Sequence, residues 1–115
     1  MTPAEMNRLI AEKVMGLKTS LNLHTETWWV FQGDCELLYE LPDPYHDERD
    51  CMRALAEMVK KGWVWGSYTN AERTHVWMAN EYDHYPASTE GCDGVAFCAA
   101  ACEAMRQAME KGDDE

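Results

Sequence analysis

The sequence predicts an α+β fold in which a small antiparallel sheet from two β-hairpins is layered with three α-helices. Two patterns indicate this class: apolar residues recur at helical spacing in three segments, and two pairs of β-branched or aromatic segments each flank a turn. The 115 residues suit one domain. We expect this domain to occupy residues 1–111, followed by an acidic tail at residues 112–115.

Three helices are expected, near residues 3–15, 46–61 and 94–111. The first begins with a capping box, because Thr2 stands at the N-cap, Pro3 at the first helical position and Glu5 three residues after the cap. The predicted buried stripe of the second helix comprises Cys51, Met52, Leu55, Met58 and Val59. The predicted stripe of the third comprises Val95, Cys98, Cys102, Met105 and Met109.

Two hairpins are expected between these helices. Residues 27–31 and 35–39 predict the first, with a turn at residues 33–34 and a plain connection before it at residues 17–26. Residues 63–69 and 74–79 predict the second, and the polar segment 81–94 predicts a surface loop. Side chains alternate along a strand, so an even-length turn places two sets of residues on opposite faces. The core face holds Trp63, Trp65, Val76 and Met78, and the other face holds Val64, Tyr68, His75 and Trp77.

Charge and composition exclude several classes of protein. The formal net charge of −11 disfavours binding to nucleic-acid backbones. No apolar run approaches the roughly 20 residues that a membrane span needs, and the N-terminus lacks a signal-peptide pattern, so we expect a cytoplasmic protein. The five cysteines are an odd number without C-x-x-C spacing, which favours reduced, structural thiols.

Catalytic and metal-binding patterns are missing from the sequence. It contains no G-x-S-x-G, no phosphate-binding P-loop and no H-E-x-x-H, so we expect no enzymatic activity and no cofactor. Two groups of potential metal ligands lack a recognised spacing, and we predict no metal site from them. They are His46 with Asp47, Asp50 and Cys51, and His84 with Asp83 and Cys92.

The tryptophan-rich second hairpin carries the candidate binding site. If helices leave its non-core face partly uncovered, Trp77, Tyr68 and His75 form an aromatic shelf that can stack on a flat ring or contact a protein. Arg73 at the adjoining turn can bind a phosphate or carboxylate. The alternative is that these side chains are buried in ordinary packing.

Three segments resemble the phage ABA-sandwich domain family of small phage and prophage proteins. They are the opening helix with Asn7, Ile10 to Glu12 and Val14 to Gly16, the segment Leu41-Pro42-Asp43-Pro44-Tyr45, and the alanine-rich run from Ala96 to Ala101. The second helix departs from the family pattern, with His46-Asp47-Glu48 and Arg53 where a Ser/Thr-Asp cap and a tryptophan are expected. The resemblance implies helices layered about an antiparallel sheet and an accessory phage protein acting in the infected bacterial cell, often against host defences. It implies no catalytic residues.

Two functions remain as alternatives. The first is a non-catalytic protein that binds and sequesters a small, nucleotide-type immune signal of the host at Trp77, Tyr68, His75 and Arg73. The second is an acidic inhibitor of a host defence protein, or a DNA mimic, acting through Asp43, Asp47, Glu48 and Asp50. In either case a homo-oligomer is possible, because a sheet of two hairpins has open edges or faces.

Overall fold

The computed structural model describes residues 2–32 and 36–113, of which 31–32, 36–39 and 111–113 are described by their backbone alone. Its elements are, in chain order, α1 (Pro3–Leu9), η1 (Ile10–Val14), β1 (Lys18–Asn22), β2 (Thr27–Gln32), β3 (Glu36–Glu40), α2 (Glu48–Lys60), β4 (Val64–Thr69), β5 (Arg73–Ala79), β6 (His84–Glu90) and α3 (Gly94–Asp113). The predicted α+β class and the predicted order of helices and hairpins are confirmed. The hairpins lie in two separate antiparallel sheets, β1-β2-β3 and β4-β5-β6.

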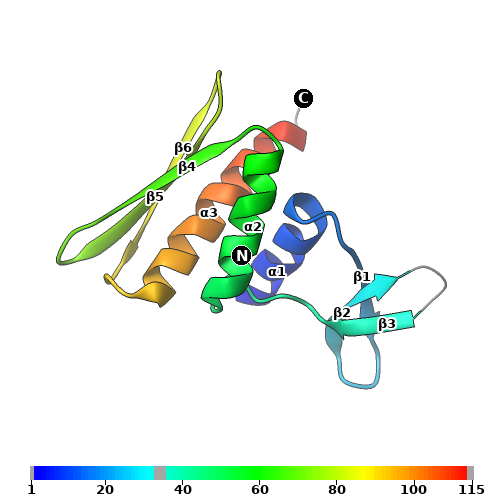
Figure 1. Ribbon diagram of the computed structural model, residues 1–115. Coiled ribbons are helices and arrows are strands. Elements are labelled where there is room, and N and C mark those ends of the chain that lie inside the picture. Colours follow the sequence, from blue (N-terminus) through cyan, green and yellow to red (C-terminus); the bar gives the residue numbers. More distant parts are fainter. Residues whose placement is uncertain (1, 33–35, 114–115) are drawn as a thin grey trace.

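The helices lie between the two sheets (Figure 1). α3 runs along the inner face of the β4–β6 sheet, α2 packs beside α3, and α1 with η1 lies on the far side of these helices. The β1–β3 sheet extends from the opposite end, where the Arg8 guanidinium lies 3.7 Å from the centre of the Trp28 ring. The chain is therefore elongated, measuring 44 × 31 × 21 Å.

The core forms where the helices meet the β4–β6 sheet. Its largest fully buried side chains include Ile10, Leu55, Met58, Met78 and Met105. α3 contributes a row of buried small residues, Ala96, Ala100, Ala101, Ala104 and Ala108. Because these side chains are small, the backbone of α3 can approach β5 and β6 closely.

Side chains cap the starts of α1 and α2, the first as predicted. The Thr2 hydroxyl accepts a hydrogen bond from the Glu5 N–H, and the Glu5 carboxylate accepts one from the Thr2 N–H. Asp47 caps α2 by accepting from the N–H groups of Arg49 and Asp50. The first helix continues from Leu9 as a π-helical turn and ends before Gly16, which takes the positive φ of 69° that favours glycine.

The predicted stripes of two helices need correction. α2 packs against its neighbours through Cys51, Ala54, Leu55 and Met58, a narrower stripe than predicted. Met52 and Val59, predicted as buried, are 47% and 50% exposed, because they lie beside this stripe on the side that α3 and η1 leave uncovered. Val95 is likewise exposed, since Ala96 takes the buried place in the first turn of α3.

Two strands replace segments that were predicted to be irregular. β1 lies within residues 17–26, and β6 occupies residues 84–90 of the segment predicted as a surface loop. Both are edge strands of their sheets and carry polar side chains, which disguise the strand pattern. The predicted turn at residues 33–34 and Cys35 lie outside the described residues. α3 continues to Asp113, two residues beyond its predicted end and into the predicted tail, whose last two residues are also not described.

The predicted register of the second hairpin is confirmed. Trp65 pairs with Met78 and Ser67 with Val76, while Gly66 pairs with Trp77 and Tyr68 with His75. Val76 and Met78 are buried in the core, and Trp63 and Trp65 pack against it. The opposite set of side chains therefore points away from the helices.

Candidate functional site

The four predicted site residues share the outer face of the β4–β6 sheet. This face lies opposite α3, and no helix or strand in the described part of the chain covers it (Figure 1). Tyr68 is 62% exposed, whereas Arg73, His75 and Trp77 are half-buried. The sheet face that carries these residues is therefore partly open, which is the condition that the sequence analysis set for a binding site. We call Trp77, Tyr68, His75 and Arg73 the aromatic shelf.

The Trp77 indole fills the space left by the glycine opposite it. A Cβ atom added to Gly66 would lie only 2.3 Å from Cζ2 and 2.6 Å from Cε2 of the Trp77 indole, so the ring covers the space that a side chain would occupy. The Nε1–Cε2–Cζ2 side of the indole therefore lies directly over the β4 backbone at Gly66, on the open face of the sheet.

Two further ring contacts extend the aromatic shelf. The Tyr68 and His75 rings are stacked, with centroids 5.7 Å apart and an interplanar angle of 27°. The Trp77 and His84 rings are tilted at 34° with centroids 6.0 Å apart. These contacts restrict the orientation of the rings before any ligand binds, which lowers the entropy cost of binding.

Arg73 lies at the end of this row on β5. Its Nη2 donates a hydrogen bond to the Ser88 hydroxyl at 3.3 Å, and its Nη1 lies 3.9 Å from a carboxylate oxygen of Glu90. Glu90 is 90% exposed, so water screens this ion pair and its stabilising effect is small. The guanidinium can therefore exchange that carboxylate for another anion.

The sequence interpretation missed the contribution of β6. His84, Pro86 and Ser88 project onto the same outer face, opposite Ala79, Trp77 and His75 on β5. Exposure alternates strictly along β6, with Tyr85, Ala87 and Thr89 less exposed than their neighbours. The strand period of two was therefore present in the segment, although polar residues and a proline concealed it.

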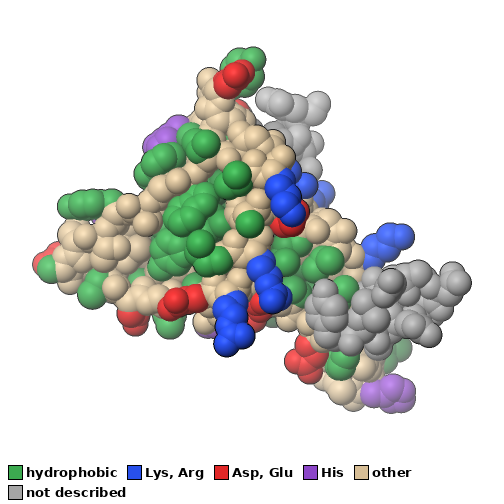
Figure 2. Space-filling model, viewed as in Figure 1, with side chains coloured by type: hydrophobic (Ala, Val, Ile, Leu, Met, Phe, Trp, Pro, Cys, Tyr) green, Lys and Arg blue, Asp and Glu red, His purple; other side chains and the backbone are tan. Residues whose placement is uncertain are grey.

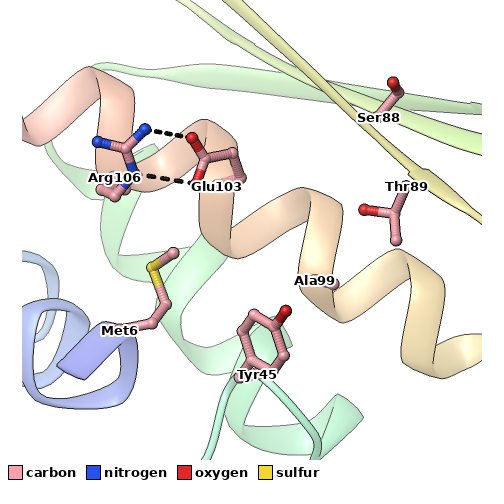
Figure 3. Close-up of a pocket in the computed structure, with 7 residues that line it drawn as sticks. All are labelled: Met6, Tyr45, Ser88, Thr89, Ala99, Glu103 and Arg106. Atoms are coloured by element: carbon pink, nitrogen blue, oxygen red, sulfur yellow. Dashed lines mark hydrogen bonds and ion pairs between the residues drawn. The ribbon is translucent and has the colours of Figure 1, made fainter. Parts of the chain in front are cut away.

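A separate pocket lies beside α3, between β6, α1 and the loop that carries Tyr45 (Figure 3). It has a volume of about 530 Å³ and is lined by Met6, Tyr45, Ser88, Thr89, Ala99, Glu103 and Arg106. Asn7 fixes the loop that carries Tyr45, since its side chain accepts from the Tyr45 N–H and donates to Asp43. Nothing in the sequence indicated this pocket, because its lining comes from four distant segments.

The charges inside this pocket largely neutralise each other. Glu103 and Arg106 form a two-bonded ion pair on α3 (Figure 3), and Arg106 also binds Glu110. The hydrogen bonds from Arg106 lower the pKa of the Glu103 carboxyl below its ordinary range, so Glu103 is ionised at neutral pH. The pocket lining contains no cysteine, histidine or lysine, and its polar groups are the hydroxyls of Tyr45, Ser88 and Thr89 and the Glu103–Arg106 pair.

The buried cysteines form one cluster between α2 and α3. Cys51, Cys98 and Cys102 are fully buried, and all three are free thiols. The contact with Cys102 and burial raise the pKa of the Cys51 thiol, and burial together with Cys51 raises that of Cys98 to about 12. Neither forms a reactive thiolate at neutral pH.

The candidate groups near the start of α2 have structural partners. Among the described residues, no three His, Cys, Asp or Glu side chains are arranged to hold a metal ion. Asp47 caps α2, the Asp50 carboxylate accepts from the Asp43 N–H, and Asp43 accepts from Asn7 and lies 3.1 Å from the His46 ring nitrogen. Most of the acidic residues in the proposed DNA-mimicking cluster are thus engaged within the chain. Over residues 2–32 and 36–113, no helix is long and apolar enough to cross a membrane.

Known proteins provide the family and the fold. The family model of the phage ABA sandwich domain matches residues 8–102 of the sequence. A solved structure of a phage protein from Bacillus cereus ATCC 14579 is similar in fold, with a TM-score of 0.68, 14% sequence identity, and coverage of 90% of this chain and 92% of that one. No curated protein matches the sequence. Because the family model spans most of the chain, the protein belongs to the phage ABA sandwich domain family.

Proposed function

We propose that this protein is a non-catalytic phage accessory protein that binds a small nucleotide-type molecule of the host on the aromatic shelf and sequesters it, which counteracts a host defence. One observation carries the proposal: the Trp77 indole lies directly over Gly66 on a sheet face that no described helix covers. An indole held on an open sheet face suits a planar heterocycle, and stacking on an aromatic side chain contributes about 1–3 kcal/mol per base.

The geometry of β5 favours an elongated ligand. Trp77, His75 and Arg73 are two residues apart, so their Cα atoms form a row about 13 Å long. A base stacked on Trp77 would extend its sugar and phosphate past His75 toward Arg73. Arg73 would supply the bidentate hydrogen bonds that a phosphate accepts, against the repulsion of a chain with net charge −11.

The residue types of the aromatic shelf support sequestration. Trp77 and Tyr68 supply aromatic surface for stacking, and Arg73 supplies hydrogen-bond donors for an anion, which are the contacts that hold and orient a ligand. The bound molecule would leave unchanged, so the phage would benefit by lowering its free concentration. We favour this function over the acidic inhibitor, because Asp43, Asp47 and Asp50 are engaged in capping and loop contacts.

Isothermal titration calorimetry with mono- and dinucleotides tests the proposal. We expect binding to the wild-type protein, a loss of at least tenfold in affinity for Trp77→Ala, and a similar loss of phosphate-dependent affinity for Arg73→Gln. Trp28→Ala is the matched control, since Trp28 is a half-buried tryptophan of the other sheet. The absence of binding by every nucleotide, or equal weakening by Trp77→Ala and Trp28→Ala, would contradict the proposal.

A further inference from the structure

The two edges of the β4–β6 sheet are protected very differently. The strand order β4-β5-β6 leaves β4 and β6 as edge strands. β6 carries Pro86 in its middle and Glu90 at its end, two devices that prevent another strand from pairing with an edge. β4 has the sequence VWGSYT, which contains no charge and no proline, and its register with β5 has no bulge.

The hydrogen-bond pattern shows which backbone groups of each edge are free. The Asn70 N–H binds the Arg73 carbonyl at the turn, and bonded pairs then alternate along the antiparallel ladder. The N–H groups of Gly66 and Tyr68 therefore point toward β5, and those of Trp65, Ser67 and Thr69 point outward. The Gly91 N–H binds the Glu72 carbonyl, and the same counting places position 86, where proline has no N–H, at the outward edge of β6.

An apolar surface adjoins the unprotected edge. Figure 2 shows hydrophobic side chains gathered between α2 and the β4–β6 sheet. Met52 and Val59 of α2 are exposed, and Trp63 and Trp65, before and within β4, are only half-buried. Contiguous exposed apolar surface of this kind is typical of protein interfaces.

The surface formed by α2 and β4 is also nearly neutral, although the chain as a whole is acidic. Residues 48–61 contain four basic side chains, Arg49, Arg53, Lys60 and Lys61, and three acidic ones, Glu48, Asp50 and Glu57. β4 adds no charge. Two copies that each carry a net charge of −11 therefore meet at this face with less repulsion than their total charge implies.

We propose that two copies of the chain associate by antiparallel pairing of β4 with β4 of the second copy about a two-fold axis. Such an axis makes the interface self-complementary, because the same outward N–H and C=O groups serve both copies. The result is a six-stranded sheet whose remaining edges are the two protected β6 strands. The two aromatic shelves then lie on one continuous outer face, with Val64 and Tyr68 of each copy at its centre.

Light scattering coupled to size-exclusion chromatography, performed without any nucleotide, measures the association directly. We expect twice the chain mass of 13.2 kDa for the wild type and a monomer for Ser67→Pro, which removes an outward N–H. Ser88→Pro is the matched control, because Ser88 occupies the equivalent outward position on β6, and it should leave the dimer intact. A wild-type monomer at all concentrations, or a dimer that survives Ser67→Pro, would overturn the proposal.

Amide hydrogen exchange of the wild type provides a second test that does not depend on any variant being folded. In the dimer, the N–H groups of Trp65, Ser67 and Thr69 should be protected, and this protection should disappear on dilution. Those of Gly66 and Tyr68 should stay protected at every concentration, because they bind β5. Rapid exchange at Trp65, Ser67 and Thr69 in a sample of doubled mass would place the interface elsewhere. Neither experiment involves ligand binding, so their failure would leave the proposed function untouched.

Discussion

Replacing Gly66 by alanine adds a single carbon atom, the Cβ, where the Trp77 indole of the aromatic shelf lies. The new Cβ would lie 2.3 Å from Cζ2 of Trp77, so the indole must move away from the β4 backbone. Overpacking costs about 1–3 kcal/mol in closed cores, and we expect about 1–2 kcal/mol here because the open outer face lets the ring tilt. For a chain of 115 residues, each kcal/mol lowers the melting temperature by about 4 °C.

The sign of this effect should reverse when the indole is absent. In a Trp77→Ala background the Cβ at position 66 meets no ring, and Gly→Ala then stabilises the protein by about 0.4–1 kcal/mol through the unfolded state. A double-mutant cycle measured by urea denaturation should give a coupling free energy of about 1.5–3 kcal/mol between the two positions. If Gly66→Ala has the same effect in both backgrounds, the indole does not lie over Gly66 and the described shelf is wrong.

Three further predictions concern the core and its charges. In a Cys35→Ser background, alkylation at pH 8 followed by mass spectrometry should label exposed Cys92 quickly and leave the buried thiols of α2 and α3 unmodified, whereas equal labelling of all four would contradict the described burial. Leu55→Ala should lower the free energy of unfolding by about 2–5 kcal/mol in urea, because Leu55 is fully buried, and a change below 1 kcal/mol would show that the core is misplaced. The hydrogen bonds from Arg106 lower the pKa of Glu103 in the folded state, so this ion pair stabilises the fold fully at pH values above the ordinary pKa of 4.5. The stabilisation is lost as the pH falls through the lower pKa of the folded state. Glu103→Gln should therefore reduce stability at pH 7 and weaken the loss of stability in acid, and unchanged acid dependence would refute the assignment.

The features that the sequence predicted correctly are those determined by short-range rules. The Thr2–Glu5 capping box depends on residues three apart, and it forms as expected. The parity of side chains along β4 and β5 depends only on an even-length turn, and it assigned Trp77 and His75 to the face opposite Val76. The open outer face itself did not follow from the sequence, because it depends on where α3 docks.

The incorrect predictions have two physical causes. Edge strands are solvated on one side, so selection against aggregation fills them with polar residues and proline. β6 therefore resembled a loop, and β1 resembled a connection. The breadth of the α2 stripe was also overestimated, because the sequence does not reveal that α2 packs on one side only and leaves Met52 and Val59 exposed.

The most direct test of the account is to identify what the protein carries from a defence-bearing host. The wild-type chain and the Trp77→Ala variant would be purified from that host and heat-denatured, and the released small molecules would be measured by mass spectrometry. The account predicts an intact nucleotide-type molecule at close to one per site from the wild type and little or none from Trp77→Ala. A folded wild-type protein that releases nothing, or equal release from both proteins, would contradict the claim that the aromatic shelf is a ligand site.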